Sequence, residues 1–88
     1  MVKTEVCRKY VFLGRPEQRT IIYYLLREEH APAPPSYGVG IAILETGEEN
    51  ELPGITFSQE AAERLADRLA TDSATPKGMG AYLLGRKR

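Results

Sequence analysis

The sequence predicts a small α+β protein in which an antiparallel β-meander of three to four strands carries one α-helix on one face, in two layers. Two patterns support this: β-branched and aromatic residues recur in short stretches, and one later stretch has apolar residues at helical spacing. The 88 residues allow one domain, residues 1–88. We expect strands over about 2–13, 19–28 and 37–45, an optional fourth over 51–57, a helix over 59–71 and a tail over 77–88.

A turn separates the first two expected strands. The stretch "VKTEVCRKYVFL" (2–13) alternates loosely and is rich in strand-forming residues. The turn "GRPEQ" follows, because Gly14 tolerates positive φ and Pro16 fixes its own φ. In "RTIIYYLLRE" (19–28) apolar residues fall on both faces, which indicates a central strand covered on both sides.

The proline-rich stretch "HAPAPPS" (30–36) is expected to be a stiff connection outside the strands, because proline cannot donate a hydrogen bond to a sheet. Its "PAPP" segment also has the composition that docks into aromatic grooves, although a hairpin connection is the simpler interpretation. A third strand and an acidic turn, "TGEEN" (46–50), come next. Pro53 and Gly54 interrupt the optional fourth strand.

The clearest element is the helix "SQEAAERLADRLATDS". Ser58 is a favourable N-cap, and Glu60 suits the positive end of the helix dipole. Apolar residues recur at helical spacing and form one stripe, Ala62, Leu65, Ala66 and Leu69. Pro76 lies beyond the expected end of the helix.

Two glycines interrupt the third strand, "SYGVGIAIL". If the strand alternates, Tyr37, Val39, Ile41 and Ile43 form one face, and Gly38, Gly40, Ala42 and Leu44 form the other. An alanine-rich helix fills space best against the bulky face, which assigns the glycines to the outer face. The alternative is that the glycines let the helix approach the sheet closely.

This assignment creates a burial problem, because one helix covers one face while the strand 19–28 is apolar on both. The other face requires cover by the C-terminal turn, by tyrosine rings folded across the glycines, or by another molecule. We therefore expect a non-enzymatic protein-interaction module whose partner is a second copy of the chain. The candidate interface residues are Tyr23, Leu25, Gly38, Gly40, Ala42 and Leu44.

Charge suggests a second function. The net charge is zero, but residues 1–27 and 64–88 each carry +4 and residues 28–63 carry −8. Basic residues in the first hairpin and the C-terminal tail make a nucleic-acid-binding regulator the alternative, although the chain lacks the net basic charge that such proteins usually have. Its candidate patch is Lys9, Arg15, Arg19, Arg86, Lys87 and Arg88.

Other chemistry finds little support in the sequence. His30 has no second ligand at metal-site spacing, and Cys7 is a lone cysteine that we expect to be a small buried thiol. No set of nucleophile, base and orienting residue can be assembled, so we expect no enzyme, cofactor, metal or small-molecule ligand. No apolar run is long enough to cross a membrane and no signal peptide is recognisable, so a cytoplasmic protein is expected.

The stretches "YYLL" and "SYGVGIAI", followed by a helix with an Ala/Leu stripe, resemble a family of small uncharacterised proteins from clostridia and related Firmicutes. The matching residues are Tyr24, Leu26, Ser36, Tyr37, Gly38, Val39 and Ile41, and the resemblance spans about residues 20–85. The basic end "GRKR" departs from the acidic tail expected of that family. The resemblance implies a bacterial origin and a shared fold but no activity.

Overall fold

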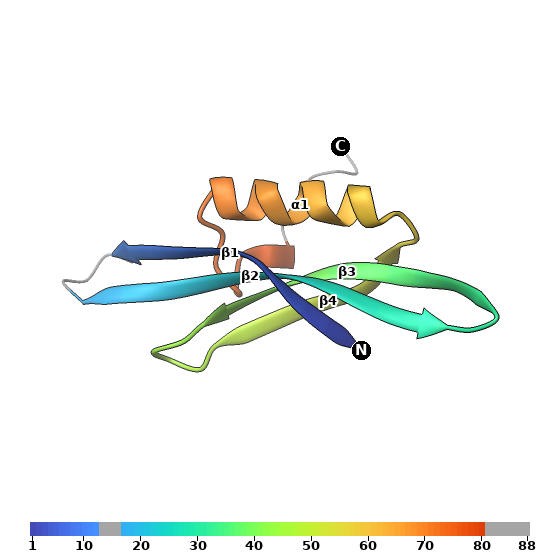
Figure 1. Cartoon of the computed structure of the whole chain (residues 1–88). Helices are drawn as coiled ribbons and strands as arrows, with labels where there is room; N and C mark the ends of the chain where they lie inside the picture. Colours follow the sequence, from blue (N-terminus) through green and yellow to red (C-terminus); the bar gives the residue numbers. More distant parts are fainter. Residues whose placement is uncertain (13–16, 81–88) are drawn as a thin grey trace.

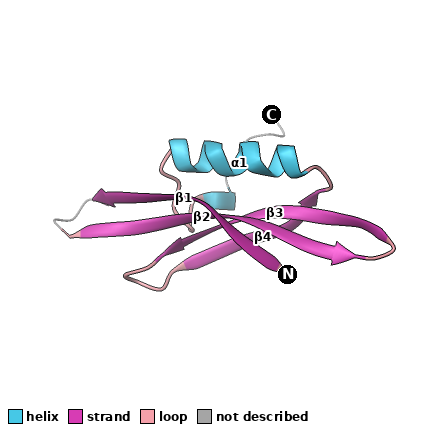
Figure 2. Cartoon of the chain, viewed as in Figure 1, coloured by secondary structure: helices cyan, strands magenta, loops and turns pink. Residues whose placement is uncertain are grey.

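Four strands and one helix make up the part of the chain that the computed structural model describes, residues 1–12 and 17–80. The strands are β1 (Val2–Phe12), β2 (Gln18–His30), β3 (Ala33–Ile43) and β4 (Glu49–Thr56), and the helix is α1 (Gln59–Thr71). Each strand pairs antiparallel with the next, giving one sheet in the order β1-β2-β3-β4. The helix lies across one face of this sheet (Figures 1 and 2), so the predicted two-layer α+β fold is confirmed with four strands.

The β2–β3 hairpin is longer than the sequence predicted. We expected residues 30–36 to lie outside the strands, but β2 runs to His30 and β3 starts at Ala33. The two strands turn over Ala31–Pro32, whose peptide bond is cis. The prolines fit because β4 pairs with β3 only as far as Tyr37, so in the described part of the chain the preceding residues of β3 have a strand neighbour on one side only.

Helix α1 begins and ends where local signals place it. The Ser58 side chain accepts a hydrogen bond from the backbone N–H of Ala61, and Glu60 lies in the first turn. Asp72 forms the C-cap, and the backbone N–H of Asp72 donates to the carbonyl of Arg68. The predicted stripe is buried, together with one further alanine: Ala62, Leu65, Ala66, Leu69 and Ala70.

The main core lies between this stripe and the bulky face of the two central strands. Strand β2 contributes Ile21 and Tyr23, and β3 contributes Val39, Ile41 and Ile43. All five are at most 4% exposed. A smaller cluster of Leu25, Tyr37 and Ala62 extends the same layer towards the start of the helix. The bulky face of β3 therefore meets the helix, and its glycines face away.

The segment after the helix returns to the core. The Tyr23 hydroxyl donates to the carbonyl of Ala74 at 2.9 Å, and the Asn50 amide donates to the carbonyl of Pro76 at 3.1 Å. Met79 is completely buried in the main core. Sequence reasoning missed this contribution, because the segment has too few apolar residues to show a period.

The burial of α1 leads to a first prediction. Leu69 is 1% exposed, so Leu69→Ala should lower the free energy of unfolding by about 2–4 kcal/mol, through lost transfer energy and a residual cavity. Arg64→Ala is the matched control on the same helix, because its side chain is 73% exposed, and it should change stability by less than about 0.5 kcal/mol. Urea unfolding of both variants measures the difference, and equal losses would contradict the packing described.

Candidate interaction surface

The sheet face opposite α1, called here the outer face, is defined by the strand register. Residues paired across antiparallel strands share a face, so the pairs Tyr24–Gly40 and Leu26–Gly38 lie together away from the helix. The helix-side pairs alternate with them. The outer face includes Lys3, Arg8, Tyr10, Phe12, Thr20, Ile22, Tyr24, Leu26, Gly38, Gly40, Ala42, Glu49 and Glu51.

Two of the predicted interface residues lie on the wrong side of the sheet. Tyr23 and Leu25 face the helix, and they are 0% and 9% exposed. Their neighbours Tyr24 and Leu26 occupy the outer face instead. The error arose because β2 is apolar at both odd and even positions, so its pattern does not reveal which set faces the helix.

Strand β4 folds over one end of the outer face, beside Gly38. A register shift between Tyr37 and Val39 marks an irregularity in the β3–β4 pairing. A Cβ atom at Gly38 would lie only 2.1 Å from the carbonyl oxygen of Leu52 and 2.7 Å from the Cα of Pro53. Residue 38 must therefore be glycine because the β4 backbone approaches it closely, and no binding partner is needed to explain it.

A charged pair closes the same end of the outer face. The Lys3 ammonium of β1 forms an ion pair with Glu51 of β4, across the two central strands, and it lies 5.7 Å from the centre of the Tyr24 ring. The hydrogen bond that the Lys3 ammonium donates to the Glu51 carboxylate raises the pKa of Lys3. The Glu51 Cγ lies 3.4 Å from the position of a Cβ on Gly40, so this glycine leaves room for the Glu51 side chain.

The glycine-rich part of the predicted interface is consequently internal. Gly38 and Gly40 are buried, and Leu26, which pairs with Gly38 from β2, is completely buried. Their cover comes from the chain's own β1 and β4, a solution that the sequence-based alternatives did not include. Of the six predicted interface residues, Leu44 alone is exposed, at 55%, while Ala42 is half-buried.

The opposite end of the outer face is open. Tyr10 and Phe12 of β1 pair with Thr20 and Gln18 of β2, and they are 60% and 66% exposed. Leu44 lies beside the same part of β2, because its backbone N–H donates to the carbonyl of Thr20. We call Tyr10, Phe12 and Leu44 the outer-face patch.

The turn after β3 holds Leu44 in this position. The Glu45 carboxylate accepts hydrogen bonds from both the backbone N–H and the hydroxyl of Thr20, each at 2.7 Å. These two hydrogen bonds, the backbone one first, hold the pKa of the Glu45 carboxyl below its ordinary value of 4.5. The exposed leucine is thus attached to an ordered turn.

The predicted nucleic-acid patch is not assembled by the described residues. Lys9 lies on the helix side, where its ammonium donates to the carbonyl of Ala70 and the hydroxyl of Ser73, both at 2.8 Å. Arg19 also lies on the helix side, with its side chain 21% exposed and 3.9 Å from the Glu17 carboxylate. Arg15, Arg86, Lys87 and Arg88 lie outside the described residues.

The remaining candidates for reactive or metal-binding residues are His30 and Cys7. His30 Nε2 forms a 2.8 Å hydrogen bond with the hydroxyl of the buried Ser36, and this contact, which sequence reasoning missed, joins the two strands of the hairpin. Cys7 is half-buried against the main core rather than fully buried. Within residues 1–12 and 17–80, no three His, Cys, Asp or Glu side chains are grouped to hold a metal ion.

Comparison with protein families gives one result. The Family of unknown function (DUF6514) matches residues 2–81, nearly the whole described fold. The chain belongs to this family. No curated protein and no solved structure matches the chain significantly. None of the described helices of this family member is both long enough and apolar enough to span a membrane.

The two glycines of β3 lead to a second prediction. Gly38→Ala should lower the free energy of unfolding by about 1–3 kcal/mol or more, because its methyl group would overlap the β4 backbone. Gly40→Ala should change it by less than about 1 kcal/mol, because its nearest neighbour is a side-chain atom at 3.4 Å. Thermal melts of the two variants make the comparison, and an unaffected Gly38→Ala would refute the close approach.

Glu45 leads to a third prediction, about pH. A carboxyl whose pKa is lowered by folding stabilises the protein above the unfolded pKa near 4.5, and that stability is lost as pH falls through the lowered pKa. Glu45→Gln should therefore be less stable than the wild type at neutral pH, and the difference should shrink on acidification below 4.5. Glu48→Gln, in the same turn, is the control for urea unfolding across this range. A difference that does not depend on pH would contradict the assignment.

Proposed function

We propose that this protein is a non-enzymatic protein-interaction module that forms a homodimer through the outer-face patch. The observation that carries the proposal is the exposure of Tyr10, Phe12 and Leu44 on one face, at 55–66%. Elsewhere on this face the apolar side chains of Ile22 and Leu26 are at most 2% exposed. Exposed apolar side chains gathered at one end of a face whose other apolar side chains are covered are typical of a contact surface.

The charges of the outer face favour a second copy as the partner. Arg8 lies on β1 at one edge, and Glu49 lies on β4 at the other edge. If two outer faces stack about a twofold axis parallel to the strands, β1 of each copy lies over β4 of the other. That axis brings Arg8 towards the Glu49 of the second copy.

The same axis also matches the apolar side chains. It keeps the open end of one sheet over the open end of the other, and it exchanges the two edges. Tyr10 and Phe12 of one copy then meet Leu44 of the second copy, instead of meeting themselves. Three side chains are few compared with the roughly 800 Å² per partner of a typical stable interface, so we expect a weak dimer that depends on concentration.

The alternative function, a nucleic-acid-binding regulator, has less support. The Lys9 ammonium is bound to Ala70 and Ser73, and the net charge of the chain is zero. A bacterial, cytoplasmic setting remains part of the proposal. Fluorescence anisotropy with labelled single-stranded DNA at low salt tests the alternative, since nucleic-acid binding would weaken steeply as salt is added.

The dimer gives a fourth prediction. The wild type should show a mass that rises towards that of two chains with increasing concentration in sedimentation equilibrium. Leu44→Glu should remain monomeric over the same range, because it places a charge in the apolar contact. The variant should still fold, because Leu44 is 55% exposed in the single chain.

Phe57→Glu is the matched control. Phe57 is 72% exposed and follows β4 at the other end of the sheet, so this variant should dimerise like the wild type. A wild type that stays monomeric, or equal effects of Leu44→Glu and Phe57→Glu, would contradict the proposed interface.

A further inference from the structure

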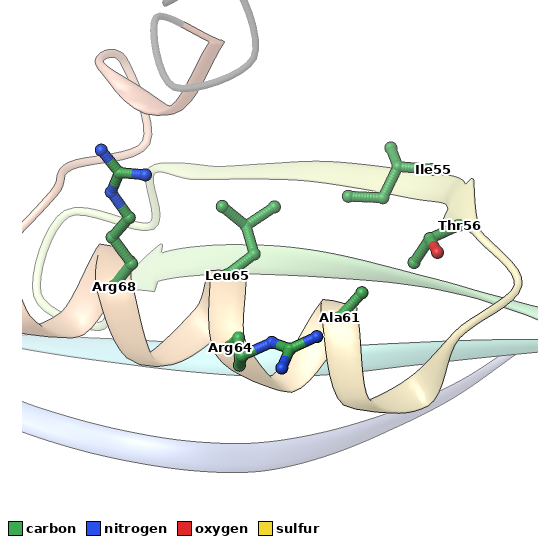
Figure 3. Close-up of a pocket in the computed structure, with 6 residues that line it drawn as sticks. All are labelled: Ile55, Thr56, Ala61, Arg64, Leu65 and Arg68. Carbon is green, nitrogen blue, oxygen red and sulfur yellow. The ribbon is translucent and has the colours of Figure 1, made fainter. Parts of the chain in front are cut away.

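A second surface lies on the helix side of the molecule, between α1 and β4. A cleft of about 350 Å³ separates them, and among residues 1–12 and 17–80 its lining comes from these two elements. Figure 3 shows the lining residues, Ile55, Thr56, Ala61, Arg64, Leu65 and Arg68. This α1–β4 cleft is on the opposite side of the sheet from the outer-face patch, so it is independent of the proposed dimer.

The cleft has an apolar floor and two cations at its helical wall. Ile55 comes from the strand and Leu65 from the helix; the Arg68 side chain rises from the helix beside Leu65, and the Arg64 side chain runs along the helix towards Ala61 (Figure 3). Arg64 is 3.5 Å from Glu60, but both side chains are more than 70% exposed, so this ion pair is weak. Within the described part of the chain, Arg68 has no ion pair. Neither arginine is needed to neutralise a buried charge of the fold.

The shape of the cleft suits an extended chain. One wall is β4, an edge strand whose far side has no strand neighbour among residues 1–12 and 17–80. Part of that edge is blocked, because Pro53 lacks an N–H and the Glu51 N–H is bonded to the side chain of Asn50. Ile55 and Thr56 follow the block and line the cleft, so backbone pairing with a ligand would be confined to them.

The spacing of the arginines defines the ligand further. Residues four apart on a helix are separated by about 6 Å along its axis. Alternate residues of an extended peptide are about 6.6 Å apart and point to the same side. The backbone positions of Arg64 and Arg68 therefore have nearly the spacing of two acidic residues separated by one other residue, and the long arginine side chains can turn to reach the two carboxylates.

We infer that the α1–β4 cleft binds an extended acidic peptide segment of another protein, with carboxylates at alternate positions. The carboxylates pair with Arg64 and Arg68, and an apolar side chain of the segment covers Ile55 and Leu65. Binding of this kind is strongest where guanidinium groups meet carboxylates directly, and it weakens with salt.

A labelled peptide tests the inference as a fifth prediction. The probe is a fluorescein-labelled peptide containing Val-Glu-Val-Glu-Val, and the comparison peptide has glutamine in place of both glutamates. Anisotropy titration should show binding of the glutamate peptide and at least tenfold weaker binding of the glutamine peptide. The double variant Arg64→Ala/Arg68→Ala should lose about tenfold or more in affinity for the glutamate peptide.

The control is Arg27→Ala, which removes an exposed arginine outside the cleft and should leave the affinity unchanged. Near-native stability is expected for the double variant, because both arginines lie outside the buried stripe of α1. No binding of the glutamate peptide, or equal loss in Arg27→Ala, would overturn the inference. Tighter binding of single-stranded DNA at the same arginines would also overturn it, since the cleft would then recognise polyanions generally. Leu44→Glu should bind the peptide like the wild type, which separates this test from that of the dimer.

Discussion

The close approach of the β4 backbone to Gly38 determines which surfaces of this protein are open. The carbonyl oxygen of Leu52 occupies the space that a side chain on residue 38 would fill. Gly54, with φ of 65°, lets β4 continue past this point. Before this irregularity Glu51 pairs in regular register with Gly40, and its side chain reaches Lys3 of β1. Leu26 and Gly40 are covered as a result, without help from a second molecule.

The two ends of the outer face differ in how well they are covered. A single short helix covers one face of a four-stranded sheet, so the second face must find other cover or remain exposed. At the closed end, the β4 backbone and the long side chains of Lys3 and Glu51 provide that cover. At the open end the strands carry Tyr10, Phe12 and Leu44 with no equivalent partner among the described residues. The two ends of the outer face therefore differ in exposure: the chain itself covers one end, and the apolar side chains of the other end are open.

Sequence patterns predicted the elements that depend on local signals. The helix has its own cap, its own apolar stripe and its own end, so its range and its buried face followed from residues 58–76 alone. The bulky face of β3 was also assigned correctly, because Tyr37, Val39, Ile41 and Ile43 alternate with small residues. The predicted length of the β2–β3 hairpin was wrong. The prolines of β3 are tolerated because they precede Tyr37, the last residue of β3 that pairs with β4. That condition depends on another strand, and no local pattern contains it.

The candidate interface was harder to predict, for the same reason. The sequence shows that Gly38 and Gly40 leave space on the outer face, but it does not show what fills that space. The occupants, the β4 backbone and the Lys3–Glu51 pair, lie far from the glycines along the chain or belong to an irregular pairing. The cleft between α1 and β4 is equally a product of the assembled fold. Its apolar floor consists of Ile55 from β4 and Leu65 from α1, which come together only in the folded chain. Arg64 and Arg68 could not be assigned to a site from the sequence, because the floor beside them is not visible there. One end of the outer face is covered by β4 and the Lys3–Glu51 pair, and on the other face α1 leaves a cleft beside β4, so the assembled fold leaves two separate surfaces open in the described part of the chain.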